Sequence, residues 1–189
     1  MLESVISHLV SYSSIDPFQK QLKESYLVKV GADGEAMLWK PLGDQHITAS
    51  CFVFSPDRNQ ILLTFHKKGQ FWVQFGGHLE AGDDTLEAAA VREAREESGI
   101  EDLELTGGVV DLDRHDLHGG FTCSRHWDVG FAAIADPDAE FSVSDESEQV
   151  QWWPVDELPS GVTPDLPLRI RRARLYLENV VEGNYPPKG

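Results

Sequence analysis

The stretch that decides the fold is Gly76-Gly77-His78-Leu79-Glu80-Ala81-Gly82-Asp83-Asp84-Thr85, followed without interruption by Leu86-Glu87-Ala88-Ala89-Ala90-Val91-Arg92-Glu93-Ala94-Arg95-Glu96-Glu97-Ser98-Gly99-Ile100. Its second half predicts a helix over residues 85–98 that ends at Gly99, because glycine readily adopts the left-handed conformation of a helix C-terminus. Small residues on one face, such as Ala89 and Ala94, would let this helix pack closely on a sheet.

The other face of the same helix carries Glu93, Glu96 and Glu97, which stand at positions i, i+3 and i+4. Adjacent like charges destabilise a helix, and a crowded carboxylate face is how proteins build an oxygen-ligand site for Mg²⁺ or Mn²⁺. The alternative is a solvated acidic face with salt bridges such as Arg92 to Glu96. The glycine pair immediately upstream favours the metal site, because glycine lets the backbone approach closely and offer its polar groups to a metal or phosphate.

Loop, helix and carboxylates together resemble the Nudix box, GX5EX7REUXEEXGU, of the Nudix hydrolase family. Gly77 matches, and residues 92–100 match in unbroken register. The first half departs from the pattern, because Asp84 stands where the box has its first Glu and six residues instead of five separate it from Gly77. Either Asp83 or Asp84 is therefore the substitute for that first acidic residue, whose role in the family is to support the loop and the arginine.

The rest of the chain reads as strands interleaved with helices, which predicts a mixed α/β sandwich. A helical pattern covers residues 1–27 with a break at Pro17, and residues 31–43 are turn-rich. The later predicted elements are strands at 48–54, 60–65, 71–75, 103–112, 127–135 and 149–153, and a helix at 168–181. The resemblance implies a Nudix fold, an α/β/α sandwich around a mixed sheet, formed by residues 43–182. Residues 1–42 would be a helical extension packed on this domain, and residues 183–189 a tail.

The resemblance also implies an activity, which is hydrolysis of a phosphoanhydride bond in a nucleoside diphosphate linked to another group X. The metal, Mg²⁺ or Mn²⁺, would be held by Glu93, Glu96, Glu97 and the backbone of Gly77, with Arg92 as a further catalytic residue. Glu93 and Glu97 are the predicted direct ligands, and Glu96 would share a second metal or act through water.

The general base is left open between two places. Relatives draw a carboxylate from the loop that corresponds to residues 144–148, which suggests Glu146, and Glu96 or Glu97 is the alternative within the box. The alternative for Glu146 is an exposed acidic loop residue without a catalytic role. For substrate binding the candidates are Gly77 and His78 in the loop and Trp72, which could stack a base, although core packing is the usual role of such a tryptophan.

Three other groups of residues are not predicted to form a functional site. His115, His118 and His126 match no zinc-binding spacing, so polar strand and loop positions are favoured over a second metal site. The two cysteines, Cys51 and Cys123, have no metal-ligand spacing either. The arginines of the last helix are expected to form a solvated face; they are Arg169, Arg171, Arg172 and Arg174.

Length and composition set the outer limits. The 189 residues favour one domain, and 16 basic against 32 acidic residues give a formal net charge of −16. Such a charge opposes binding of long nucleic acids but not of a small substrate bridged by a metal. No apolar run approaches the roughly 20 residues that span a bilayer, and no secretory signal is visible. We therefore expect a cytoplasmic protein without a membrane or nucleic-acid partner, and a homodimer is one of the oligomeric states left open.

Two alternatives to hydrolysis are retained. One is a nucleotide-binding or sensing domain that does not turn its ligand over, but such domains usually lose carboxylates that this chain keeps. The other is the isopentenyl-diphosphate isomerase-like branch of the fold, which uses a cysteine and a glutamate. Cys51 precedes the box, yet the intact carboxylate pattern fits hydrolysis better.

Overall fold

The centre of the computed structural model is strand β1 (Gln45–Phe54), whose residues are almost all buried. The structure describes residues 1–40, 42–117, 123–143 and 147–181. Strand β6 (Arg125–Ile134) runs parallel to β1 along its whole length, from Gln45 opposite Arg125 to Phe54 opposite Ile134. A strand covered on both faces is usually a nearly continuous apolar run, which explains why residues 48–54 predict a buried strand.

Most of the remaining elements lie close to the predicted ones, and α3 and α4 in particular confirm their predictions. They are α1 (Leu2–Ser11), α2 (Pro17–Asp33), the 3₁₀-helix η1 (Gly34–Met37), β2 (Gln60–His66), β3 (Phe71–Val73), β4 (Phe75–His78), α3 (Leu86–Ser98), β5 (Asp111–Asp116), β7 (Ser147–Pro154) and α4 (Leu166–Val181).

The sheet has the order β3-β2-β1-β6-β5, with β4 also paired to β1 and β7 paired to β2. Because β1 and β6 are parallel and the other pairs antiparallel, the sheet is mixed, as predicted. One edge of β1 is shared by two strands. Thr48 to Cys51 pair with β4, and Val53 and Phe54 pair with β2. This arrangement places Gly76 and Gly77 against the middle of β1.

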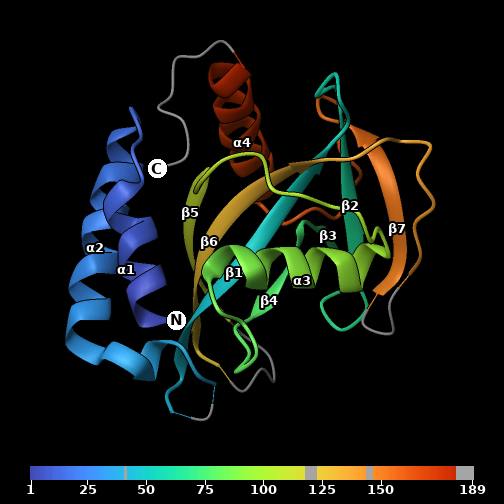
Figure 1. Ribbon diagram of the computed structural model, residues 1–189. Helices are drawn as coiled ribbons and strands as arrows, with labels where there is room; N and C mark the ends of the chain where they lie inside the picture. The colour runs from blue at the N-terminus through green and yellow to red at the C-terminus, as the bar shows by residue number, and fades with distance from the viewer. Residues whose placement is uncertain (41, 118–122, 144–146, 182–189) are drawn as a thin grey trace.

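Helices cover both faces of this sheet (Figure 1). Alternate residues of β1 point to opposite faces. Ala49 and Cys51 lie in clusters with residues of α3, whereas Phe52 and Phe54 pack against residues of α4. The two helices therefore lie on opposite sides of β1, and the α/β/α sandwich is confirmed.

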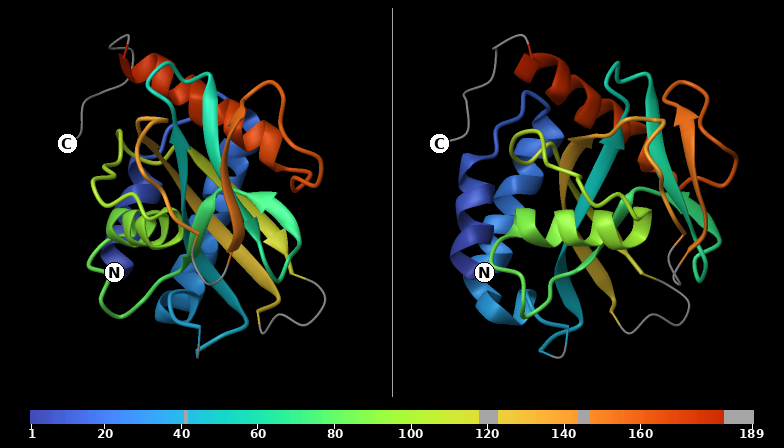
Figure 2. Two further views of the ribbon diagram at one scale, coloured as in Figure 1. Left: turned by 90° about the vertical axis from the view of Figure 1, so that its right-hand side faces the viewer. Right: turned by 45° about the vertical axis from the view of Figure 1, so that its right-hand side comes forward.

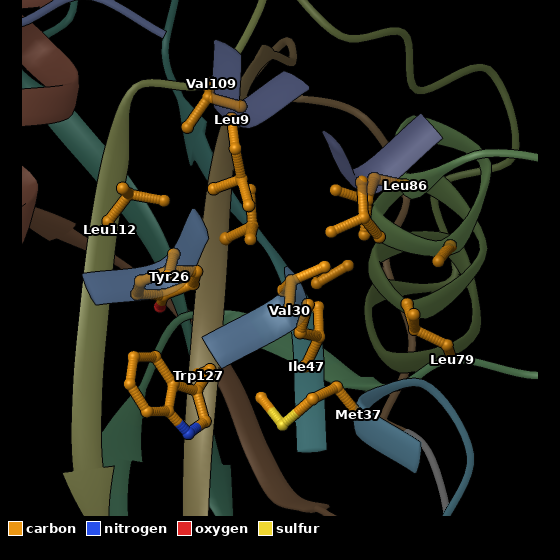
Figure 3. Close-up of a cluster of buried hydrophobic side chains, with 14 of the residues drawn as sticks. Leu9, Tyr26, Val30, Met37, Ile47, Leu79, Leu86, Val109, Leu112 and Trp127 are labelled. Carbon is orange, nitrogen blue, oxygen red and sulfur yellow. The ribbon is translucent and has the colours of Figure 1, made fainter. Parts of the chain in front are cut away.

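The N-terminal helices α1 and α2 lie side by side against the sheet on the α3 side (Figures 1 and 2). Figure 3 shows the apolar cluster that they form with β1, β5, β6 and α3, in which Leu9, Tyr26 and Val30 meet Trp127 and Leu86. Polar contacts fix the packing. The Gln19 side-chain amide donates to the Leu112 carbonyl at 2.8 Å and accepts from the Leu112 backbone amide at 2.9 Å. Both backbone groups of Leu112, on the outer edge of β5, therefore have hydrogen-bond partners. In the described part of the chain, no helix is long and apolar enough to cross a membrane.

The prediction of a turn-rich segment at residues 31–43 was wrong in its first half, because α2 continues to Asp33 and η1 follows. Leu22, Tyr26 and Val30 form a buried stripe at helical spacing, so tertiary burial overrides the low helix propensity of Gly31. The helix ends at Gly34, whose φ of 54° is one that glycine adopts readily.

The predicted strand at residues 103–112 was also wrong over most of its length, since β5 begins only at Asp111. Leu105 makes an isolated bridge to Ala133, and Gly107, with a φ of 95°, then breaks the strand. A Cβ at Gly107 would lie 2.7 Å from the Tyr176 hydroxyl, and the Gly108 amide donates to that hydroxyl at 2.9 Å, so this segment contacts α4 at its glycines.

The prediction of a solvated arginine face was wrong for Arg169, which is only 2% exposed. Its guanidinium donates to Asp111 at 2.7 Å and to Asp128, and Asp128 also accepts from Thr48 and Ser50. A buried charge is tolerated when it is paired and hydrogen-bonded, and this network joins α4 to the sheet.

Candidate active site

Helix α3 presents its carboxylates from a well-defined position. The Thr85 hydroxyl caps the N-terminus by accepting from the Ala88 amide at 3.1 Å, and Gly99 ends the helix with a φ of 73°. Leu86, Ala89 and Ala94 are fully buried on the face of the helix that packs against the sheet. The predicted helix is confirmed, and its small residues bring the backbone of α3 close to β1 and β4 (Figure 1).

The three glutamates differ in how they meet the rest of the protein. Glu97 is 7% exposed and accepts a hydrogen bond from the Gly76 amide at 3.0 Å. The Glu93 side chain is 16% exposed, whereas that of Glu96 is 61% exposed. Glu93 and Glu97 therefore form the inner part of the cluster, and Glu96 lies at its solvent side.

Gly77 lies directly against one of these carboxylates. A Cβ at this position would lie 2.6 Å from Oε1 of Glu93 and 2.7 Å from Oε2, so no side chain can be accommodated without moving the glutamate. Close approach, not an unusual backbone angle, is the reason for glycine here. The glycine loop therefore lies against both inner carboxylates, with Gly77 beside Glu93 and the Gly76 amide bound to Glu97. Carboxylate and carbonyl oxygens are hard donors, which is the ligand type that suits Mg²⁺ or Mn²⁺.

Arg92 makes most of the charged contacts beside the carboxylates of α3. Its Nε and Nη2 donate to the two carboxylate oxygens of Asp83, both at 2.9 Å, and Nη2 also donates to the His78 carbonyl at 3.1 Å. Its Nη1 donates to Glu93 at 2.9 Å and to Glu96 at 3.3 Å. The guanidinium therefore connects the glycine loop to the carboxylates of α3.

The Asp83 contact decides between the two possible substitutes for the first acidic residue of the box. Asp83 is buried and also accepts from the Glu80 amide at 2.8 Å, whereas Asp84 is exposed. Burial works against ionisation of Asp83, but its hydrogen bonds from Arg92 and Glu80 outweigh this, so the pKa of Asp83 lies below its usual range. The hydrogen bonds from Arg92 to Asp83 in turn raise the pKa of Arg92.

The other predicted site residues lie further from this centre. His78 follows Gly77 on β4 and faces the opposite side, where its ring contacts those of His46 and His126. Trp72 is buried in a core cluster and makes edge contacts with Phe65 and Trp153. Glu146 lies outside the described residues. Substrate contacts by His78 and Trp72 remain predictions.

One group of residues was missed by the sequence interpretation. The side chains of His46, His78 and Cys123 come together, with Sγ of Cys123 3.3 Å from Nε2 of His78. Burial, aided by the nearby charges of Lys40 and His46, lowers the pKa of His78 to about 4. The three residues are far apart in sequence, so no local spacing could have connected them. Only the pairing of β1 with β4 and β6 brings them together.

Comparisons with known proteins agree with this geometry. The family model described as NUDIX domain matches residues 44–177. A NUDIX-family hydrolase from Clostridium perfringens is 23% identical, with a TM-score of 0.58, and the match covers 70% of this chain and 97% of that chain. An Ap4A hydrolase from C. elegans, solved as a binary complex, is 17% identical with a TM-score of 0.59, covering 70% and 98%.

A third similar structure is the NUDIX domain of Shewanella oneidensis NrtR, solved in complex with ADP ribose. It is 18% identical with a TM-score of 0.56, and the match covers 79% of this chain and 97% of that chain. No curated protein sequence matches. Because the family model spans most of the chain and the structures share its fold, the chain belongs to the NUDIX domain family.

Proposed function

We propose that this NUDIX-family protein is a hydrolase that uses Mg²⁺ or Mn²⁺ to cleave a phosphoanhydride bond in a nucleoside diphosphate linked to another group X. The observation that carries the proposal is the contact of Gly77 with Glu93, beside the buried Glu97. These two inner carboxylates lie against the glycine backbone and can supply a cation with oxygen ligands.

Glu93 and Glu97 are the proposed direct ligands, together with the carbonyl group of Gly77. When bound, a divalent cation neutralises the charge of a diphosphate, orients it and makes a water more acidic. The hydrogen bond from the Gly76 amide holds the Glu97 carboxylate in one orientation. Glu96 lies at the solvent side of the cluster, where it can bind a second cation or act through water.

Arg92 is proposed to position the ligands. Its hydrogen bond to Glu93 fixes one carboxylate, and the paired hydrogen bonds to Asp83 fix the guanidinium itself. A positive charge beside the cluster also reduces the repulsion between carboxylates before a cation binds. The loop and the helix therefore enter the reaction as one preorganised unit.

The general base has the same candidates that the sequence provides. Glu146 is the candidate outside the box, and Glu96 or Glu97 is the candidate within it. A base must reach the proton that it abstracts, either directly or through one water. Glu96 has the more accessible carboxylate of the two box residues, and Glu97 the more constrained one.

The substrate class follows from the cation site and the chain's net charge of −16. An acidic protein that binds a negative substrate needs cations between the two, which favours small di- and polyphosphates over long nucleic acids. The similar structures named above include an Ap4A hydrolase and a domain bound to ADP ribose. We propose a small nucleotide of this kind, in a cytoplasmic setting that suits two cysteines that are not joined in a disulfide.

A substrate screen tests the proposal. The full chain is assayed with ADP-ribose, dinucleoside polyphosphates, nucleotide sugars and oxidised nucleotides, each with Mg²⁺, Mn²⁺ or EDTA. We expect metal-dependent release of phosphorylated products from at least one class. Turnover that is undiminished in EDTA would refute the metal mechanism, and saturable nucleotide binding without turnover would favour a sensing domain.

The isomerase-like alternative is disfavoured by Cys51. This residue is fully buried on β1, in the cluster on the α3 side, and its burial raises the pKa of the thiol well above the usual range. A thiol that is neither accessible nor ionised cannot serve as the catalytic cysteine of that branch.

A further inference from the structure

A second cluster of metal-binding side chains lies on the other side of β4 from the carboxylates. One donor atom each from His46, His78 and Cys123 lies within 4.8 Å of the other two. His46 comes from β1, His78 from β4, and Cys123 from the segment that leads into β6. Three parts of the chain that are distant in sequence thus place their donor atoms together.

The spacing of two of these atoms suits a shared metal ion. Sγ of Cys123 lies 3.3 Å from Nε2 of His78. In tetrahedral zinc, Zn–S and Zn–N bonds of about 2.3 and 2.0 Å place neighbouring S and N ligands roughly 3.5 Å apart. Small side-chain movements would therefore bring the two donors to ligand positions.

His46 supplies independent support, because its ring is buried without a hydrogen bond. It is 1% exposed, and within the described residues neither ring nitrogen has a hydrogen-bond partner. The backbone of Lys40 and Gly43 lies near the ring and partly opposes the lowering of its pKa by burial, but it makes no hydrogen bond of normal geometry. Leaving a buried polar group unsatisfied costs about 1–3 kcal/mol, so such a group calls for an explanation.

We propose that His46, His78 and Cys123 bind a Zn²⁺ ion, with the fourth position open to water or to an anionic oxygen of a ligand. Imidazole and thiolate are the donors that zinc prefers, whereas Mg²⁺ and Mn²⁺ prefer the carboxylates of α3. Three protein ligands with an open position are typical of reactive zinc sites, and closed sites have four.

The zinc site and the carboxylate site are neighbours but do not share a side chain. Gly77 faces Glu93 of α3, and His78, the next residue, faces His46 on the opposite side of β4. The ring of His126 lies 4.7 Å from that of His78, and its buried Nε2 also lacks a hydrogen bond within the described residues. Its atoms are outside the converging set, so we assign it no ligand role.

Metal content of the purified full chain tests this proposal without any assay of hydrolysis. The protein is stripped with a chelator, incubated with Zn²⁺ or Co²⁺ in the presence of excess Mg²⁺, desalted and analysed by mass spectrometry of the metals. We expect about one equivalent of zinc to be retained per chain. The Co²⁺ form should show the intense visible bands of four-coordinate cobalt and a thiolate-to-cobalt charge-transfer band in the near ultraviolet.

Matched variants identify the ligands. Cys123→Ser and His46→Ala should weaken zinc binding at least about 100-fold, since loss of even an outer partner of a metal ligand costs 10–100-fold. Cys123→Ser should also abolish the charge-transfer band. Cys51→Ala removes the other cysteine and should keep the metal and the band, as should Glu97→Gln, which alters only the carboxylate site.

Circular dichroism and melting curves show whether each variant is folded, and the cobalt spectrum of the unaltered chain is informative even if a variant is not. The proposal is overturned if the unaltered chain retains no zinc, or if folded Cys123→Ser and His46→Ala retain as much as Cys51→Ala. Zinc loss in Glu97→Gln together with retention in Cys123→Ser would also overturn it, because the ion would then belong to the carboxylates. None of these outcomes depends on whether the proposed hydrolysis occurs.

Discussion

Replacement of Asp83 by alanine tests the part of the site in which the sequence departs from the Nudix box. The change removes both carboxylate oxygens that hold Arg92 and the acceptor of the Glu80 amide. Asp84→Ala is the matched control, because Asp84 is the adjacent acidic residue but is exposed. The two variants therefore differ in position by one residue and have the same change in charge.

The expected magnitude follows from these contacts. Hydrogen bonds to charged groups contribute about 1.5–3 kcal/mol each, and breaking a buried ion pair costs about 3–5 kcal/mol. Arg92 is 21% exposed and keeps its contacts with Glu93 and the His78 carbonyl, which reduces the loss. We expect Asp83→Ala to lower the free energy of unfolding by about 2–4 kcal/mol, or roughly 5–15 °C in Tm, and Asp84→Ala by less than about 0.5 kcal/mol.

Asp83→Ala should also weaken the affinity of the site for Mg²⁺. Without Asp83 the guanidinium can shift, and Glu93 then loses a fixed partner. Since outer partners of metal ligands affect affinity by about 10–100-fold, the Mg²⁺ concentration for half-maximal hydrolysis should rise by about that factor. Chemical unfolding and Mg²⁺ titration of activity measure the two effects, and Asp84→Ala should match the unaltered chain in both.

The pH dependence has a definite sign. The folded-state pKa of Asp83 is lowered, so its contribution to stability is fully present above the unfolded pKa of about 3.9 and is lost as the pH falls through the folded pKa. The difference in unfolding free energy between the unaltered chain and Asp83→Ala should therefore be constant near neutral pH and shrink below about pH 4. Equal stability of Asp83→Ala and Asp84→Ala at pH 7 would refute the assignment of Asp83 as the partner of Arg92. A larger loss of stability in Asp84→Ala would assign that role to Asp84.

The remaining predictions concern the carboxylates and the base. Glu97→Gln should keep the fold but lower kcat by orders of magnitude at any Mg²⁺ concentration, because a neutral amide is a weak Mg²⁺ ligand; near-normal rates would place the metal elsewhere. Gly77→Ala should lower activity more than stability, because the new Cβ displaces Glu93 while the backbone angle stays acceptable; comparison of kcat with the melting temperature checks this. Glu146→Gln should lower kcat about 10²–10⁴-fold and remove the acidic limb of the pH–rate profile if Glu146 is the base. An unchanged kcat and limb would return that role to Glu96 or Glu97.

The sequence was most informative where local pattern and global packing agree. The helix α3 has its cap, its small buried face and its final glycine within the stretch from Thr85 to Gly99, so each feature can be predicted without knowing the fold. The failures occurred where a distant residue decided the outcome. Burial of Val30 and Tyr26 against residues of β1 and β6 extends α2 past a glycine. The strand predicted at residues 103–112 is interrupted at Gly107, which has a positive φ and lies against Tyr176 of α4.

The two clusters on either side of β4 show the same distinction at the level of the site. Glu93 and Glu97 are one helical turn apart, and a glycine loop precedes them, so their proposed role can be predicted from a single stretch of sequence. His46, His78 and Cys123 have no common period, and no count of histidines or cysteines could have joined them. Their proximity depends on β1 pairing with β4 on one side and with β6 on the other. The two proposals together place a soft-donor cluster assembled across three segments beside a hard-donor cluster on one helix. Under them, the adjacent residues Gly77 and His78 would serve metals of different chemistry on opposite faces of one short strand.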